Sequence, residues 1–218
     1  FSSTTAAYSS STFDSSNNKI VVAYADNNNY GTGVVGTVSG NTVSYGTPVV
    51  FSAATSYYTS IVYDSANNRV VIAYTDVGNS SYGTAIVGTV SGTSISFGTA
   101  VVFNAANTDS IGIGFDSNAN KVVIAYRDIV GTVSGTSISF GTEVVYQSSN
   151  SEYNAVTFDS SNNKIVVAYT CAATNGTASV GTVSGTSISF GTAVAFNPTR
   201  SSNYLSGAFD SNSNKVVL

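Results

Sequence analysis

The sequence predicts an all-β fold, a β-propeller of four-stranded antiparallel blades with about 50 residues per blade, and three observations lead to it. Related segments recur along the 218 residues at offsets of 50, 52, 43 and 51 residues. Each period holds four runs rich in Val, Ile, Tyr, Phe and Thr, separated by Gly, Asn, Asp and Ser. One run per period is apolar at every position, which indicates a strand buried on both faces. Such burial is expected of a strand inside a blade that lies between two other blades.

The second copy illustrates the four expected strands in chain order. They span Tyr57 to Tyr63, Arg69 to Tyr74, Ile86 to Val90, and Ser94 to Phe103. The second of these runs is the most hydrophobic. A sheet with one face in water would instead alternate apolar and polar residues. A β-solenoid is the alternative architecture, although its coils are usually shorter than this period.

Four copies of the repeat are complete, and a fifth ends within its second strand. We expect a single propeller domain or segment over residues 1–218, with repeats at 2–51, 52–103, 104–146, 147–196 and a partial repeat at 197–218. This arrangement favours five blades. The missing strands would then come from a longer parent protein or from a neighbouring chain.

Composition excludes several classes of chemistry. The chain has no histidine, so it lacks Ser-His-Asp triads, histidine general bases and histidine-ligated metals. Its one cysteine, Cys171, cannot form an internal disulfide. A net charge of -4 argues against nucleic-acid binding, and no apolar run approaches the roughly 20 residues of a membrane helix. We therefore expect no nucleic-acid partner, no membrane insertion, no cofactor and no metal.

Most acidic residues occupy repeated positions. Five of the 11 carboxylates belong to one repeated turn, namely Asp14, Asp64, Asp116, Asp159 and Asp210. An aspartate that accepts hydrogen bonds from the following backbone suits a tight hairpin turn, so we interpret these residues as structural. A calcium site at the turn is the weaker interpretation, because one carboxylate per turn is few for that ion. A glycosidase would need two carboxylates on either side of one bond.

Two further motifs match patterns that have known functions. Residues 31–36, Gly-Thr-Gly-Val-Val-Gly, match the three-glycine dinucleotide pattern. That pattern requires a helix to follow, whereas here a strand follows, and we interpret the segment as a turn. Asn79 and Asn175 fit the N-glycosylation pattern and are candidate glycosylation sites.

Variation among the copies points to one rim of the propeller. The loops between second and third strands and the connections between blades lie on the same rim, and they differ in sequence and length in every copy. Because loops on rigid scaffolds carry function, we predict binding there through tyrosines and an arginine. The candidates are Tyr30, Tyr57, Tyr58, Tyr82, Arg127, Tyr153 and Tyr204, with Tyr8 on the same rim.

The Asp-x-x-x-Asn-Lys-Val-Val-Val-Ala-Tyr hairpin is similar to hairpins of YVTN-type bacterial propellers. The repeated Val-Gly-Thr-Val-Ser-Gly and Ser-Ile-Ser-Phe-Gly-Thr units resemble the highly repetitive propellers of marine phage virion and tail-fibre proteins and of bacterial surface proteins. The resemblance implies a structural or adhesive module at an extracellular or virion surface. Its partners would be a cell-surface glycan or protein, or neighbouring copies of itself.

These observations together predict a non-enzymatic structural and adhesive module that binds through its variable rim. The alternative is a glycan-binding lectin with one site per blade. A glycosidase-like five-bladed enzyme is a remote alternative.

Overall fold

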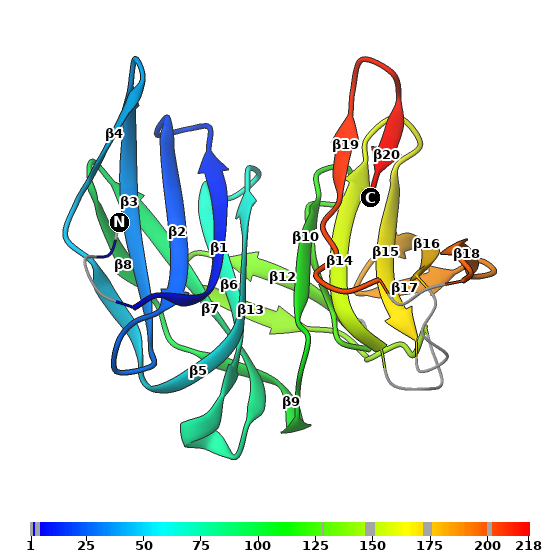
Figure 1. Ribbon diagram of the computed structural model, residues 1–218, viewed down its shortest axis with the longest axis horizontal. Coiled ribbons are helices and arrows are strands. Elements are labelled where there is room, and N and C mark those ends of the chain that lie inside the picture. Colours follow the sequence, from blue (N-terminus) through cyan, green and yellow to red (C-terminus); the bar gives the residue numbers. More distant parts are fainter. Residues whose placement is uncertain (1, 3–4, 128, 147–150, 172–175, 200–201) are drawn as a thin grey trace. The chain divides into compact units, whose positions relative to one another are not determined.

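The computed structural model describes residues 2, 5–127, 129–146, 151–171, 176–199 and 202–218 (Figure 1). The chain divides into two compact units. The first comprises Phe1–Asp109 and Val133–Ile138, and the second comprises Ser110–Thr132 and Ser139–Leu218. Each unit is built from antiparallel strands, as the sequence predicts. None of the helices among the described residues has the length and apolar character needed to cross a membrane.

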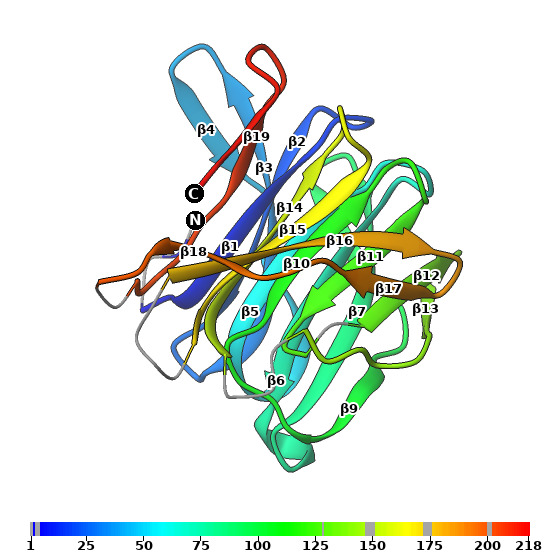
Figure 2. The same ribbon diagram turned by 90° about the vertical axis from the view of Figure 1, so that its right-hand side faces the viewer.

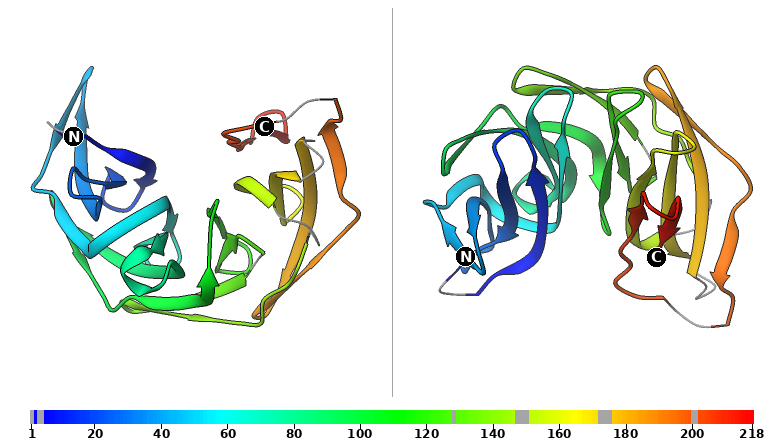
Figure 3. Two further views of the ribbon diagram at one scale, coloured as in Figure 1. Left: turned by 60° about the horizontal axis from the view of Figure 1, so that its bottom comes forward. Right: turned by 90° about the horizontal axis from the view of Figure 1, so that it is seen from above.

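The first unit contains two blade-like arrangements joined by one long strand. Its elements are β1 (Ala7–Asp14), β2 (Lys19–Ala25), β3 (Tyr30–Ser39), β4 (Thr42–Tyr45), β5 (Val49–Asp64), β6 (Arg69–Asp76), the 3-10 helix η1 (Val77–Asn79), β7 (Tyr82–Ser91), β8 (Ser94–Phe97) and β9 (Val101–Asn107). The sheet order is β1-β2-β3-β5-β6-β7-β8, with β4 also on β3 and β9 also on β7. The start of β5 pairs with β3 and its end pairs with β6, so β5, cyan in Figure 3, passes from one blade into the next.

The second unit is also built from antiparallel sheets, but among the described residues no single strand passes from one of its sheets into the next (Figure 2). The strands from Ser110 onward are β10 (Gly112–Asp116), β11 (Lys121–Ala125), β12 (Ile129–Ser134), β13 (Ser137–Phe140), β14 (Ser151–Asp159), β15 (Lys164–Cys171), β16 (Gly176–Ser184), β17 (Ser187–Phe190), β18 (Val194–Asn197), β19 (Ala208–Asp210) and β20 (Lys215–Val217). All belong to the second unit except the end of β12 and the start of β13, which fall within Val133–Ile138 of the first unit. They form the sheets β10-β11-β12-β13 and β14-β15-β16-β17, with β18 also on β16, and the hairpin β19-β20.

In the four complete copies the second strand is largely buried on both faces, which confirms the prediction from its apolar run, whereas the short β20 of the partial copy is largely exposed. In β6, Val70, Val71, Ile72 and Ala73 are all 0% exposed. Val70 and Ile72 pack in one cluster with Val21 of β2, so the two blades of the first unit meet face to face. Opposite sides of the same strand therefore serve different packing surfaces, because strand side chains alternate.

The same contact recurs in the second unit. Val123 and Ala125 of β11 pack in one cluster with Ile165, Val167 and Tyr169 of β15. These residues correspond in the repeat to the faces that meet in the first unit. Within each unit, one face of a second strand therefore packs against the opposite face of the second strand in the following copy, as the stacking of propeller blades requires.

The repeated aspartates close the turn between first and second strands. The Asp64 Oδ1 atom accepts hydrogen bonds from the backbone N–H groups of Ala66 and Asn67, both at 3.0 Å. Its Oδ2 atom accepts one from Asn67 Nδ2 at 2.8 Å. Asn68 then adopts φ 53°, a left-handed conformation that asparagine tolerates well. These contacts agree with the structural interpretation of the turn, which stays a prediction.

Two expectations about strands are wrong. Residues 31–36 form no turn but lie inside β3, where a Cβ at Gly31 would overlap the Phe51 ring. The glycine makes room for that ring across the sheet. The run from Ser94 to Phe103 is not one strand but two, β8 and β9, and both pair with β7. Gly98 lies between them and donates its N–H to Val87 O at 2.9 Å.

Candidate functional site

The first strand of a blade begins with a β-bulge. In the second copy, Tyr57 pairs with Thr75 and Ser60 with Ala73, so two residues, Tyr58 and Thr59, stand opposite one. The same register shift occurs between Ala7 and Ser10 and between Glu152 and Ala155. A bulge of this kind often has glycine as its first residue, because that residue is left-handed.

Tyrosine occupies this left-handed position in four of the five copies. The equivalent residues and their φ angles are Tyr8 (50°), Tyr58 (50°), Ser110 (54°), Tyr153 (55°) and Tyr204 (56°). Holding a residue other than glycine in this region costs of order 1–3 kcal/mol. Strain of this type gathers at binding and catalytic sites, where the surrounding structure maintains it. The repeated tyrosine is therefore the strongest functional signal in the described chain.

In the first unit these tyrosines form a cluster of three rings. The ring centroid of Tyr8 lies 5.1 Å from that of Tyr57 and 5.4 Å from that of Tyr58, with tilts of 48° and 57°. Tyr8 is 43% exposed and Tyr58 is 36% exposed. We call Tyr8, Tyr57 and Tyr58 the first tyrosine cluster.

In the second unit the corresponding tyrosines form a pair. The centroids of Tyr153 and Tyr204 are 5.1 Å apart, and the rings are tilted by 59°. Tyr204 is 86% exposed, the highest value among the exposed large hydrophobic side chains. We call this pair the second tyrosine cluster. Ser110 takes the same backbone conformation without an aromatic ring.

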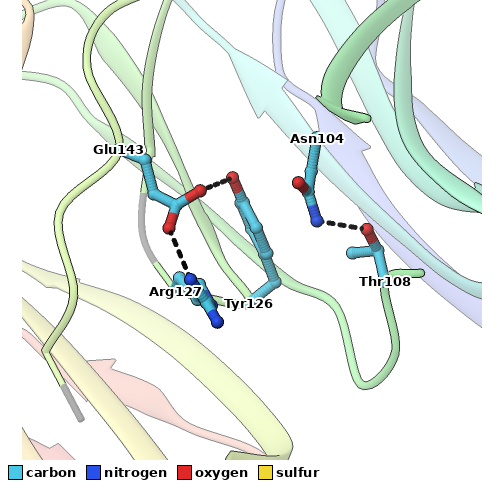
Figure 4. A network of polar contacts seen from close by, with 5 residues as sticks. All are labelled: Asn104, Thr108, Tyr126, Arg127 and Glu143. Atoms are coloured by element: carbon cyan, nitrogen blue, oxygen red, sulfur yellow. Dashed lines mark hydrogen bonds and ion pairs between the residues drawn. The ribbon is translucent and has the colours of Figure 1, made fainter. Parts of the chain in front are cut away.

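In the first unit, hydrogen bonds fix the chain just before the bulge position. Thr108, two residues before Ser110, is buried, and its N–H donates to Ser81 O at 3.1 Å. The Thr108 hydroxyl accepts from Asn104 Nδ2 at 2.8 Å (Figure 4), and its carbonyl accepts from the Thr75 hydroxyl. In the preceding copy, the Ser56 N–H donates to Asn29 O at 2.9 Å. These contacts join the loop between second and third strands to the connection between blades.

The second unit uses equivalent residues. The Thr170 hydroxyl donates to Ser202 O, and Asn197 Nδ2 donates to the Ser202 hydroxyl at 3.1 Å. Ser202 lies two residues before Tyr204. The tyrosines thus stand on a backbone that is tied on both sides, which limits the entropy lost when a ligand binds them.

Arg127, a predicted binding residue, has another contact. Its Nη1 atom lies 3.2 Å from Glu143 Oε1, and the other oxygen of Glu143 accepts from the Tyr126 hydroxyl at 3.0 Å (Figure 4). Glu143 stands where two other copies have alanine. No contact joins Arg127 to Tyr153 or Tyr204 among the residues that the structure describes.

The other predicted residues lie apart from the ring clusters. Tyr30 and Tyr82 are the first residues of β3 and β7 and pair with Thr55 and Asn107. Tyr30 is 37% exposed. Asn79 is exposed in η1, whereas Asn175 lies outside the described residues. Glycosylation at either position stays a prediction.

Sequence reasoning found most of these tyrosines but missed that their position repeats. Each lies five residues before the aromatic residue of the aspartate turn: Tyr8 before Phe13, Tyr58 before Tyr63, Tyr153 before Phe158 and Tyr204 before Phe209. Aligning the copies on that turn would have shown the repeat. The left-handed backbone itself has no signal in the sequence, because tyrosine rarely adopts it.

One tyrosine near the bulge has a strongly shifted pKa. Opposite the bulge, Tyr74 is almost fully buried. Burial, with a smaller contribution from Asp76, raises the pKa of Tyr74 well above its ordinary value of 10.0. No group of three or more His, Cys, Asp or Glu side chains that could hold a metal ion occurs within the described ranges. The arrangement offers neutral aromatic rings with hydroxyl groups.

Comparison with solved structures supports the fold. The chain is similar to an arginine-to-alanine variant of AofleA from Arthrobotrys oligospora, with a TM-score of 0.53, 10% identity, and coverage of 86% of this chain and 56% of AofleA. It is also similar to an exo-β-1,3-galactanase from Phanerochaete chrysosporium, with a TM-score of 0.48, 7% identity, and coverage of 82% and 47%. Both are β-propeller proteins.

The likeness to AofleA, at 10% identity, shows the fold alone, and no argument rests on the galactanase, whose TM-score is 0.48. The chain spans about half the length of each of these proteins. No protein-family model and no curated protein matches the sequence. The chain therefore has a β-propeller-like fold, and five blades stay a prediction.

Proposed function

We propose that this chain is a non-enzymatic carbohydrate-binding module, in which the tyrosine clusters stack against sugar rings. The observation that carries the proposal is the exposed tyrosine held in a left-handed bulge and repeated in both units. The C–H groups on one side of a pyranose form an apolar face that suits an aromatic ring, while the tyrosine hydroxyl remains available for hydrogen bonds. The lectin alternative thus becomes the preferred function.

The repeat itself favours a lectin over a purely structural module. A lectin with one site per blade should repeat its ligand-contacting residues, and the bulge position is repeated while neighbouring loops vary. The residue before it also varies: Ala7, Tyr57, Asp109, Glu152 and Asn203. An aromatic ring present in four of the five copies, beside a variable side chain, would give related sites with different preferences. AofleA is a fungal lectin, which agrees with the proposal but shows only the fold.

The carboxylates support binding without catalysis. The five repeated aspartates each accept hydrogen bonds within their own turns. Glu143 is paired with Arg127. We place the module at an extracellular or virion surface, as the resemblance to phage and bacterial surface propellers implies, with a cell-surface glycan as its partner.

A glycan array followed by calorimetry on the best ligand tests this function. Tyr204→Gly removes the most exposed ring and leaves a residue that accepts the left-handed backbone without strain. We expect binding at that site to weaken by about tenfold or more, or roughly 1.4 kcal/mol, while the protein becomes about 1 kcal/mol more stable. Losing affinity while gaining stability would separate a ligand contact from a folding defect.

Tyr45→Ala is the matched control. Tyr45 is 39% exposed but lies on β4, the outer strand of its blade. The Tyr45→Ala substitution should leave glycan binding unchanged. A wild-type protein that binds no glycan, or a Tyr204→Gly variant with full affinity at every site, would refute the proposed function.

A further inference from the structure

We propose that the two tyrosine clusters are oxidative cross-linking sites, at which a peroxidase with hydrogen peroxide joins neighbouring rings as dityrosine. The inference concerns covalent modification and is independent of glycan binding. It is carried by the geometry of the clusters and by the absence from the chain of most side chains that would compete for oxidation.

Each cluster brings together tyrosines from different copies of the repeat. Tyr153 is in β14 and Tyr204 precedes β19, yet their ring centroids are 5.1 Å apart. Tyr8 is in β1 and Tyr58 in β5, with centroids 5.4 Å apart. The rings of each pair are neighbours, so coupling between carbons ortho to the two hydroxyls needs rotation of the side chains but no rearrangement of the strands.

The rings are accessible to an external oxidant. Tyr204 is 86% exposed and Tyr8 is 43% exposed. Both residues have a left-handed backbone, and the hydrogen bonds of Ser202 tie the backbone that precedes Tyr204. A tied backbone that holds an exposed ring beside its partner favours coupling within the pair over coupling between molecules.

Composition directs oxidation toward tyrosine. The chain contains no Trp, no Met and no His, and only one Cys. Methionine and cysteine are the usual oxidation targets, and tryptophan also donates an electron readily. With these residues absent or reduced to Cys171, the exposed tyrosines become the main electron donors.

The chemistry balances with hydrogen peroxide as the oxidant. Each of two tyrosines loses one electron and the phenolic proton, which gives two phenoxyl radicals. The radicals couple through a new bond between their ortho carbons, and the hydrogen on each of these carbons moves to the phenol oxygen. The peroxide takes up the two electrons and two protons and leaves as two water molecules. The protein thus loses two hydrogen atoms per cross-link.

A cross-link would join consecutive copies covalently. In the second unit it would hold the hairpin β19-β20 to β14. Because a covalent link restricts the unfolded chain, as a disulfide does, the linked hairpin should resist proteolysis and thermal unfolding. Ser110 leaves the third copy without this link.

Treatment of dilute protein with a peroxidase and hydrogen peroxide, followed by peptide mass spectrometry, tests the proposal. We expect monomeric protein containing linked peptides Tyr153–Tyr204 and Tyr8–Tyr57 or Tyr8–Tyr58, with dityrosine fluorescence. Tyr204→Phe should abolish the Tyr153 link and leave the first cluster linked. Tyr30→Phe is the matched control, because Tyr30 is 37% exposed and no ring neighbours it among the described residues.

Repeating the experiment with the Cys171→Ser variant tests whether the cysteine takes part in the oxidation. This variant should give the same linked peptides. The proposal is overturned if the links form mainly between molecules, if they form as readily at Tyr30 as at the clusters, or if Tyr204→Phe leaves the Tyr153 product unchanged. Glycan binding measured on untreated protein does not enter any of these outcomes, so the two proposals can fail separately.

Discussion

The two ends of the first strand of a blade differ in how well their residues suit the local backbone conformation. At its end, Asp64 and Asn68 adopt conformations for which their side chains are well suited. At its start, Tyr58 adopts a conformation that tyrosine rarely takes. The first arrangement is stabilising and the second is strained, and both recur in the other copies. Residues that conflict with local preference mark function more often than those that agree with it.

The buried Tyr74, which lies opposite the bulge at Tyr58, makes stability sensitive to alkaline pH. The folded-state pKa of Tyr74 is raised above its ordinary value of 10.0, mainly by burial. Its contribution is therefore complete below pH 10.0 and is lost as pH rises above it, because the unfolded chain releases the proton there. Each such group lowers the free energy of unfolding by about 1.4 kcal/mol per pH unit.

Tyr74→Phe removes that proton and keeps the ring. We expect denaturant titrations to show a shallower alkaline loss of stability for the variant by about 1.4 kcal/mol per pH unit above pH 10. At neutral pH the variant should lose about 1 kcal/mol with the hydrogen bond to Ser52. Tyr30→Phe, at an exposed position, is the control. Parallel alkaline slopes for wild type and Tyr74→Phe would contradict the prediction.

Sequence could predict the members of the site better than their arrangement. Tyr58, Tyr153 and Tyr204 follow from loop variation and residue type. Their contacts depend on the bulge, and a bulge built on tyrosine instead of glycine leaves no compositional trace. Arg127 is predicted as a binding residue of the variable rim. Neither Arg127 nor its partner, Glu143, has a charged residue at the equivalent position of the other complete copies. Two opposite charges introduced in the same copy indicate an ion pair.

At the scale of elements, glycine determines how closely consecutive blades approach. Gly46 follows β4, and Gly141 follows β13. A Cβ on Gly46 would overlap Thr93 O, and one on Gly141 would overlap Thr186 O. Each of these threonines lies in the turn between third and fourth strands of the next copy. The glycine after the fourth strand of one copy and the threonine in the Ser-Gly-Thr turn of the next copy therefore form one close backbone contact.

Gly141→Ala should disrupt this contact. The added methyl would overlap a backbone oxygen, which cannot move as a flexible side chain can, and overpacking typically costs about 1–3 kcal/mol. Gly191 is the matched position in the next copy, where the only atom near an added Cβ would be Val180 O at 3.8 Å. Both glycines donate their N–H to the third strand at 2.9 Å.

Chemical denaturation of the two variants provides the measurement. We expect Gly141→Ala to lose about 2 kcal/mol and Gly191→Ala to stay within about 0.5 kcal/mol of wild type. Equal losses would mean that the glycines matter only within their own blade, through backbone conformation, and not in the contact with the next one.

The elements were predictable where periodicity dictates them. The period, the two-sided burial of Val70 to Tyr74 and the aspartate turns all follow from residue pattern. The break between β8 and β9 could not be read from Ser94 to Phe103, because this run has no proline or charge and its one glycine also suits a strand edge. The placement of Gly31 inside β3 depends on the Phe51 ring, a contact between separate strands that local pattern does not reveal.

For the whole molecule, the main physical feature is how little its stability depends on charged groups. Only 8% of the residues are charged, and the net charge is -4. Within the described part of the chain, one ion pair occurs, between Arg127 and Glu143, with side chains 63% and 31% exposed. Stability must come from apolar packing and from hydrogen bonds of neutral or turn side chains. Such a molecule should tolerate wide changes in ionic strength.

We therefore predict that sodium chloride has almost no effect on folding. Raising its concentration to about 1 M shortens the screening length to about 3 Å, which removes long-range interactions between exposed charges. Because exposed ion pairs contribute only about 0–1 kcal/mol, the free energy of unfolding should change by less than about 1 kcal/mol, and Arg127→Ala should be equally insensitive to salt. Denaturation with urea, which is uncharged, keeps ionic strength independent of the denaturant. A large loss of stability in salt would mean that attractive charge pairs contribute more than the single ion pair suggests. A large gain of stability in salt that occurs only at acid pH would reveal repulsion among the lysines and arginines of neighbouring aspartate turns.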